Sequence, residues 1–299
     1  MAGVTGKTQI DQATRKFLAE SRFVLQERPG VVWASIQTET LGQNQGPAVN
    51  VPKYSTVTTF ALTEGIDMAQ AQQITDTMMV LTPAEFGAQV VLTDLMLMTV
   101  KDEFFRVAGR ILADSYDRQR EETLCDDFDN YSKNQGTTTG VAFNLGNLMA
   151  GHAAIKYGPP AAAAGRGGEP GPDPVTCIAT PAQIHSLKKT IVGAIGATSN
   201  TQPPPAVDRT PYSESFDTAG VTVKQSININ KDSLDDAKLA IFSKQAQIGV
   251  QLGSGPGVEK ERDASLRGWE LNFVGRWARG EYNDNWGIEG LYDSTNPTS

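Results

Sequence analysis

The sequence has few of the side chains that build metal and redox sites, with two cysteines and two histidines among 299 residues. Cys125 and Cys177 lie far apart and in no C-x-x-C pair, which argues against a disulfide framework and a thiolate metal site. We expect both to be small buried hydrophobic residues. His152 and His185 stand in no H-E-x-x-H or H-x-H pattern, so we expect neither to bind a metal.

Positive charge and long apolar runs are also scarce. The chain carries 26 Lys and Arg against 34 Asp and Glu, a net charge of −8, whereas nucleic-acid binding rests on clustered cations. No apolar run approaches about 18 residues, and no basic and then apolar leader opens the chain. We therefore expect a soluble protein that folds in a cytoplasm, without a membrane partner and without sequence-specific binding of DNA.

The motifs of common enzyme classes are missing as well. No G-x-S-x-G elbow offers a nucleophile. The glycine-rich segments 165–171 and 253–257 lack both the strand–loop–helix setting and the Lys–Ser/Thr of a phosphate loop. Acid pairs such as Asp126–Asp127 and Glu259–Glu261 are present, but nothing in the sequence selects one of them for acid–base chemistry. We expect no catalytic residue, no cofactor-binding residue and no metal ligand, and hence no enzyme.

The most prominent pattern is a long amphipathic helix over 99–133. Apolar residues recur there at spacings of three and four, which is the helical period: Phe104, Ala108, Ile111, Tyr116, Leu124, Phe128 and Tyr131. Thr99 and Asp102 resemble a capping box at its start. About 30 residues of helix would span about 45 Å, far above the usual length of roughly 11 residues. A rod of this length indicates that other elements lie across it.

The N-terminal third predicts an arm followed by a β-rich extension. Residues 1–30 combine a polar start with one short helical pattern, which cannot form a domain alone. Strand-like runs follow at 54–62, 74–81 and 86–92, in a region where Lys53 is the only base. Such an extension would expose apolar surface and strand edges. The residues leave two readings open, one in which it folds back on its own core and one in which it lies on a neighbouring subunit.

The C-terminal half predicts alternating helices and strands. Thr180, Pro181 and Gln183 form a capping box with proline at the first helical position, directly after an apolar strand, which is typical of α/β structure. The other expected elements are helices over 141–157 and 233–244, strands over 175–178, 221–229, 269–277 and 286–292, and loops over 158–174 and 196–220. We expect the segment 159–174 to be an exposed loop that tolerates insertions.

This order of elements resembles the Hong Kong 97 type major capsid protein of tailed bacteriophages. Residues 85–95 look like the strand that returns from the extended loop of that family and enters its spine helix, and 99–130 looks like the spine helix with its acidic end at 125–127. Residues 175–187 are similar to the strand and proline-started helix of the axial domain. Residues 239–247 resemble a late helix, and 259–277 resemble the long strand of the peripheral domain.

The resemblance implies an α+β major capsid fold. Its parts would be an N-terminal arm (1–49), an extended β-hairpin loop (50–92), a peripheral domain with the spine helix (93–135), a mainly axial domain (136–257), and the long and C-terminal strands of the peripheral domain (258–299). The segment before the extension is too short for a fused scaffold, so we expect none. The extension would then lie on a neighbouring subunit.

The implied function is that of a structural protein of the virion. Subunits would assemble with each other, as hexamers and pentamers, into an icosahedral head that encloses phage DNA, with scaffolding, portal and decoration proteins as further partners. Assembly would take place in the host cytoplasm. Two alternatives remain at this point: an encapsulin-like shell around a cargo protein, which shares the fold, and an α/β enzyme without a recognisable motif.

Overall fold

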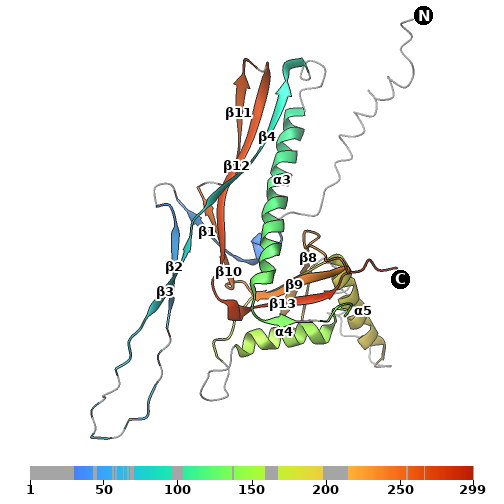
Figure 1. Ribbon diagram of the computed structural model, residues 1–299. Helices are drawn as coiled ribbons and strands as arrows, with labels where there is room; N and C mark the ends of the chain where they lie inside the picture. Colours follow the sequence, from blue (N-terminus) through green and yellow to red (C-terminus); the bar gives the residue numbers. More distant parts are fainter. Residues whose placement is uncertain are drawn as a thin grey trace, which may run out of the picture.

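The computed structural model describes residues 30–42, 46–55, 57, 59–62, 64–65, 67, 71–95, 104–136, 138–158, 168–197, 215–253, 255–265 and 267–298. It is a mixed α+β structure, as predicted, with a long five-stranded sheet, a six-stranded sheet and a separate two-stranded hairpin. Figure 1 shows the long sheet standing beside one long helix, with the six-stranded sheet below it. No helix in the described ranges is long and apolar enough to cross a membrane.

The long sheet is organised around β12 (Gly268–Glu281). On one edge β12 pairs antiparallel with β4 (Ala84–Thr93) along the whole of β4, and on the other edge it pairs with β11 (Gly257–Asp263) and β10 (Gln247–Leu252). The short strand β1 (Gln37–Leu41) then pairs parallel with β10. The alternation expected over 269–277 is therefore real, and it places every second side chain of β12 on the face that the helix covers.

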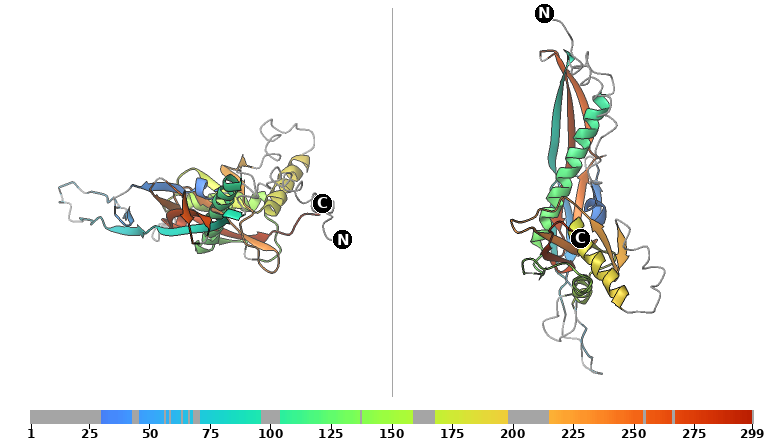
Figure 2. Two further views of the ribbon diagram at one scale, coloured as in Figure 1. Left: turned by 90° about the horizontal axis from the view of Figure 1, so that it is seen from above. Right: turned by 90° about the vertical axis from the view of Figure 1, so that its right-hand side faces the viewer.

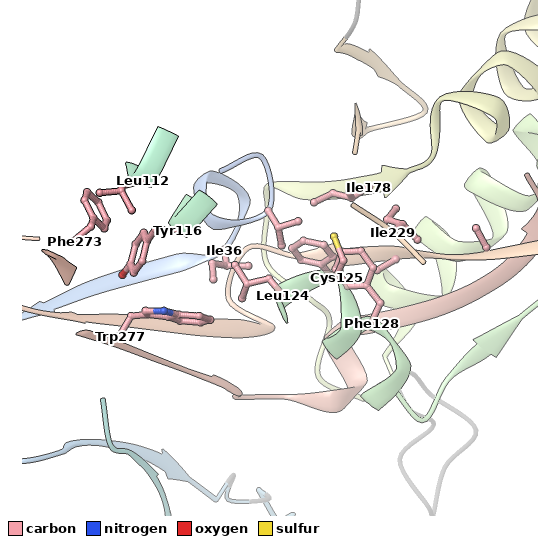
Figure 3. Close-up of a cluster of buried hydrophobic side chains, with 14 of the residues drawn as sticks. Ile36, Leu112, Tyr116, Leu124, Cys125, Phe128, Ile178, Ile229, Phe273 and Trp277 are labelled. Carbon is pink, nitrogen blue, oxygen red and sulfur yellow. The ribbon is translucent and has the colours of Figure 1, made fainter. Parts of the chain in front are cut away.

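Helix α3 (Phe104–Asp126) lies along that face (Figures 1 and 2). Leu112 and Tyr116 point toward β12, and the rings of Tyr116 and Phe273 lie 5.1 Å apart (Figure 3). Gly275 makes this approach possible, because a Cβ atom there would lie 2.2 Å from the Tyr116 hydroxyl. The helix passes into the 3-10 turn η2 (Asp127–Asn130), so it ends earlier than expected, and Thr99 and Asp102 of the expected cap lie outside the described residues.

The six-stranded sheet has the order β5-β13-β9-β6-β8-β7. Its strands are β5 (Asn134–Gln135), β6 (Val175–Ala179), β7 (Phe216–Thr218), β8 (Val221–Gln225), β9 (Asp236–Ser243) and β13 (Gly287–Asp293). One face packs on α4 (Leu145–Tyr157) and α5 (Pro181–Ala197). Residues of the opposite face, including Ile178 and Phe242, join a cluster with Leu124 and Phe128 at the end of α3 and its following turn. The sheet is therefore buried on both sides.

The start of α5 confirms the predicted capping box. The Gln183 side chain accepts from the Thr180 backbone N–H at 3.0 Å, and the Thr180 hydroxyl accepts from the Gln183 N–H at 3.4 Å. The helices expected over 141–157 and from 181 onward, and the strands expected at 175–178, 221–229 and 286–292, are all found, with shifted ends. The arm at 1–29 and the loop segments 159–167 and 198–214 lie outside the described residues.

Three expectations are wrong. Residues 233–244 form strand β9 after a turn, and 239–247 cover the end of β9 and the start of β10, so neither expected helix exists. A strand buried on both faces reads as a continuous apolar run, which periodicity alone does not distinguish from a buried helix. The first hairpin strand is β2 (Val49–Tyr54), and the described part of 55–62 contains no strand. Finally, the single long strand expected over 259–277 is divided into β11 and β12, which pair antiparallel, and β7 lies in the segment 196–220 that was expected to be a loop.

Candidate assembly surfaces

The hairpin of β2 and β3 (Asp76–Leu81) projects away from both sheets (Figures 1 and 2). Its register runs from Val49 opposite Leu81 to Tyr54 opposite Asp76. One further rung is closed by Ser55 and Thr75, whose backbone N–H and carbonyl groups bond at 2.8 Å. A two-stranded hairpin without a third strand or a covering helix is marginally stable in water.

The root of the hairpin is anchored to the long sheet. Leu81 is buried in a small cluster with Ile248 and Val250 of β10, and the hydroxyl of Tyr282 donates to the carbonyl of Pro52 at 3.3 Å. Because these contacts involve only the residue pairs at the base, the root holds the hairpin at a defined position, while its outer described residues join none of the buried clusters of the described chain. The hairpin is therefore fixed at one end and bare at the other.

Large apolar side chains are exposed along the bare part. We call this set the apolar strip: Tyr54, Val57, Phe60, Leu62, Ile74, Met78 and Val80, each between 51% and 68% exposed. Single exposed apolar residues are common, but a contiguous series on one projecting element marks an interaction surface. The described part of the segment 54–80 contains no basic residue, and its charges are the three acids Glu64, Asp67 and Asp76.

A second surface begins where the N-terminal arm meets α3. The backbone N–H of Val32 donates to the buried carboxylate of Glu121 at 2.8 Å. Arg120 stacks over the Trp33 ring at 4.8 Å and pairs with Asp117 at 2.9 Å. Burial raises the pKa of Glu121, and the N–H of Val32 together with the Arg120 charge opposes that shift. These contacts fix the turn at 30–36 against α3.

The free edge of the long sheet differs from the hairpin in being charged. Strand β11 alternates acids on one face with bases on the other, and Lys260 lies over the Trp269 ring at 4.1 Å while Arg262 pairs with Asp94 at 2.9 Å. In a two-fold antiparallel pairing of β11 with a second copy, like charges would lie opposite each other. Charged edge strands of this kind oppose edge-to-edge association. The edge of β11 is therefore a poor candidate for self-pairing.

The residues considered for chemistry are scattered. His152 on α4 is half-buried, and His185 on α5 is exposed. Both cysteines are free and buried, and burial strongly raises the pKa of the Cys177 thiol. Within the described residues, no group of three or more His, Cys, Asp and Glu side chains could hold a metal ion.

The acids of the two candidate pairs have separate surroundings. Asp126 accepts from the Asn230 amide and Asp127 pairs with Arg279, while Glu259 and Glu261 are exposed on β11. The structure therefore brings these candidates together at no common site. Sequence reasoning missed Glu121, which occupies a buried position on an otherwise apolar face of α3; a lone acid on such a face is the signal that could have found it.

No protein-family model and no curated protein sequence matches the chain. Solved structures do match. The capsid of the cyanophage P-SCSP1u has a TM-score of 0.63 at 12% identity, over 90% of each chain. The acid-stable capsid of the Helicobacter pylori bacteriophage KHP30 has a TM-score of 0.64 at 8% identity, over 90% of this chain and 92% of that one. The SrpI encapsulin complex of Synechococcus elongatus has a TM-score of 0.64 at 12% identity, over 97% and 98%.

These likenesses cover nearly the whole chain and agree in kind. The chain therefore has the fold of Hong Kong 97 type phage capsid proteins, which confirms the fold predicted from the resemblance. At identities of 8–12% the likeness establishes the fold and leaves the function to be argued from the surfaces described above.

Proposed function

We propose that this chain is the major capsid protein of a tailed bacteriophage, a structural subunit that assembles with copies of itself into an icosahedral head around phage DNA. The observation that carries the proposal is the hairpin, which is anchored at its root and presents the apolar strip, whose side chains are more than half exposed in the described part of the subunit. A surface of this kind gains free energy only when another chain covers it, at about 25 cal/mol per Å² of apolar area. The shared fold of phage shell proteins supports the same conclusion.

The parts of the subunit follow the predicted division with three adjustments. Residues 1–49 would be the arm, α3 the spine helix of the peripheral domain, and the six-stranded sheet with α4 and α5 the core of the axial domain. Strand β10 falls in the predicted axial range but pairs in the long sheet, and β13 falls in the predicted peripheral range but pairs in the six-stranded sheet. The third adjustment concerns the extended loop. The resemblance described above implies an extended loop over 50–92. Because β4 pairs with β12 throughout its length, we now propose that the loop ends at Leu81 and that β4 belongs to the peripheral domain.

The partners follow from the shell. Copies of the chain would form hexamers and pentamers, with portal, scaffolding and decoration proteins at particular positions, and the subunit would act as a building block and not as an enzyme. A net charge of −8 suits a wall that encloses DNA without gripping it. The protein would be made in the host cytoplasm and end in the virion.

The second candidate is a shell around a protein cargo, because the encapsulin matches this chain over 97% of its length. The two candidates share the fold and differ in what the particle holds. Expression of the chain, alone and with the gene products encoded next to it, followed by light scattering and negative-stain microscopy, should reveal particles in the megadalton range, capsomers or sheets. Nuclease-protected DNA inside particles from infected cells would favour the capsid, and one co-purifying folded protein would favour the cargo shell. A chain that stays monomeric under all these conditions would refute both.

A further inference from the structure

A cavity of about 380 Å³ lies where the hairpin joins the body. It is bounded by the end of β3, the start of β4, η2, and the adjoining parts of β10 and β12. Its walls combine two aromatic side chains, Phe86 and Trp277, whose ring centroids are 5.1 Å apart, with a small number of polar groups. Val80 lines the cavity and also belongs to the apolar strip, so the cavity is continuous with the surface along which we expect a second copy to lie.

Two of the polar groups are hydrogen-bond acceptors without a donor. Gln247 on β10 and Glu281 on β12 are directly opposite each other in the sheet, so their side chains lie next to each other on one face. Gln247 is only 4% exposed. Among the described residues, the Oε1 atoms of both side chains are buried and have no hydrogen-bond partner. A buried acceptor that stays unpaired loses its hydrogen bonds to water without replacement, so such a pair calls for a donor from elsewhere.

The charged groups around the cavity do not supply that donor. Of the described residues that line it, Arg279 is the only cation, and it is paired with Asp127 through two contacts. Glu281 is hydrogen-bonded to Asp284, and burial, followed by the charges of Asp284 and Asp127, raises the pKa of Glu281 to about 7. The site therefore has acceptors and negative charge that the described part of its own subunit leaves unmatched.

We propose that this cavity receives a lysine or arginine side chain of a second copy of this chain, which donates to the Oε1 atoms of Gln247 and Glu281. The long hydrocarbon stem of such a side chain would lie along Phe86 and Trp277, whose rings pack on each other, while its charged group reaches the two acceptors. Lysine and arginine are donors only, which matches the two unpaired acceptors of Gln247 and Glu281. The inference rests on the proposed function, because it names one contact that would hold the root of the hairpin to the neighbouring subunit.

The first test is a cryo-EM map of assembled wild-type particles at side-chain resolution. We expect density for a Lys or Arg side chain of a neighbouring subunit within hydrogen-bond distance of Gln247 and Glu281. A cavity that holds only solvent, or a bond from the Gln247 amide to the Glu281 carboxyl within one subunit, would overturn the inference while leaving the shell function intact. Wild-type protein that forms no particle would end both proposals.

The second test uses variants of the two acceptors. Gln247→Met removes the acceptor at nearly constant volume, and Glu281→Gln removes the charge. Both should raise the protein concentration needed for assembly at least tenfold, whereas Glu259→Gln, the same change on the exposed strand β11, should leave it within twofold. Circular dichroism melting curves would show that each variant is folded. Folded acceptor variants that assemble like the wild type would refute the inference.

Discussion

Strand β9 and the hairpin strand β3 show two uses of the same kind of sequence. In β9, Leu239, Ile241 and Phe242 are fully buried between helices on one side and the end of α3 on the other. In β3, Met78 and Val80 are 57% and 58% exposed. Both segments are short, apolar and poor in charge, so local propensity alone does not distinguish them. The difference lies in what the rest of the subunit provides.

This contrast indicates that the six-stranded sheet and the hairpin contribute to different processes, namely folding and assembly. The six-stranded sheet has its core within the chain, so its side chains contribute to the free energy of folding of a single subunit. The hairpin has cover only at its root, so its outer side chains contribute chiefly when another chain is present. A substitution should therefore change subunit stability in the first region and assembly in the second.

Removal of the outer hairpin should have the largest effect. Lys53 and Thr77 are directly opposite each other, so replacing 54–76 by Asn-Gly gives a two-residue turn at a register that such turns favour. We expect a folded subunit with a melting temperature near that of the wild type and a complete loss of assembly, measured by light scattering. As a control, Glu64→Gln alters the polar part of the hairpin and should preserve assembly. Complete shells from the shortened chain would show that the hairpin serves its own subunit.

A matched pair of leucine substitutions should separate the two regions next. Leu239→Ala creates a cavity in the six-stranded sheet and should lower the free energy of unfolding by about 2–5 kcal/mol. Leu62→Ala removes the same atoms from a side chain that is 68% exposed and should change it by less than about 0.5 kcal/mol, while weakening assembly. Urea unfolding gives the first quantity. Equal losses of stability in both variants would contradict the division.

The sequence predicted these regions unequally, for physical reasons. The capping box at Thr180 and Gln183 and the alternation over 269–277 were recovered because both are local patterns. Residues 233–244 were assigned to a helix because a strand buried on both faces has no alternation to read. The pairing of β4 with β12 joins residues far apart in the chain, so no local pattern indicates it, and the prediction places β4 in the extended loop. Nothing local marked Gln247 and Glu281 as neighbours, for the same reason.

Gln183 illustrates a residue whose local role was predicted and whose long-range role was not. Besides accepting from Thr180, its amide group donates to the carbonyls of Ala237 at 2.8 Å and Tyr292 at 3.0 Å, and so joins α5 to both β9 and β13. Gln183→Leu keeps the volume but removes the hydrogen bonds that Gln183 makes to the Thr180 N–H and to the Ala237 and Tyr292 carbonyls. We expect a loss of about 1–3 kcal/mol by urea unfolding.

The control for this substitution is Gln119→Leu on the exposed face of α3, which should change stability by less than about 0.5 kcal/mol. Assembly at a temperature at which Gln183→Leu is still folded should proceed normally, because the change lies in the self-contained region. A Gln183→Leu subunit as stable as the wild type would show that the three backbone groups find other partners.

The smallest effect concerns pH and the root of the hairpin. The folded pKa of Glu281 is about 7, above its ordinary value of 4.5, because of burial and then the nearby Asp284 and Asp127. The native subunit therefore binds more protons than the unfolded chain between these two values, so the free energy of unfolding should fall as pH rises through this window and level off above it. Since Glu281 is only half-buried, solvent screening reduces the effect to on the order of 1 kcal/mol.

Glu281→Gln should remove this pH dependence and leave the isolated subunit more stable than the wild type at pH 8, with little difference at pH 5. Melting temperatures of both proteins across this range, with Glu259→Gln as the matched exposed control, measure the effect. Parallel curves for wild type and Glu281→Gln would show that Glu281 titrates normally. A variant that is more stable as a subunit and weaker in assembly would mean that the wild-type carboxylate is unfavourable within one subunit and favourable between two. That outcome would show the division between folding and assembly at a single side chain.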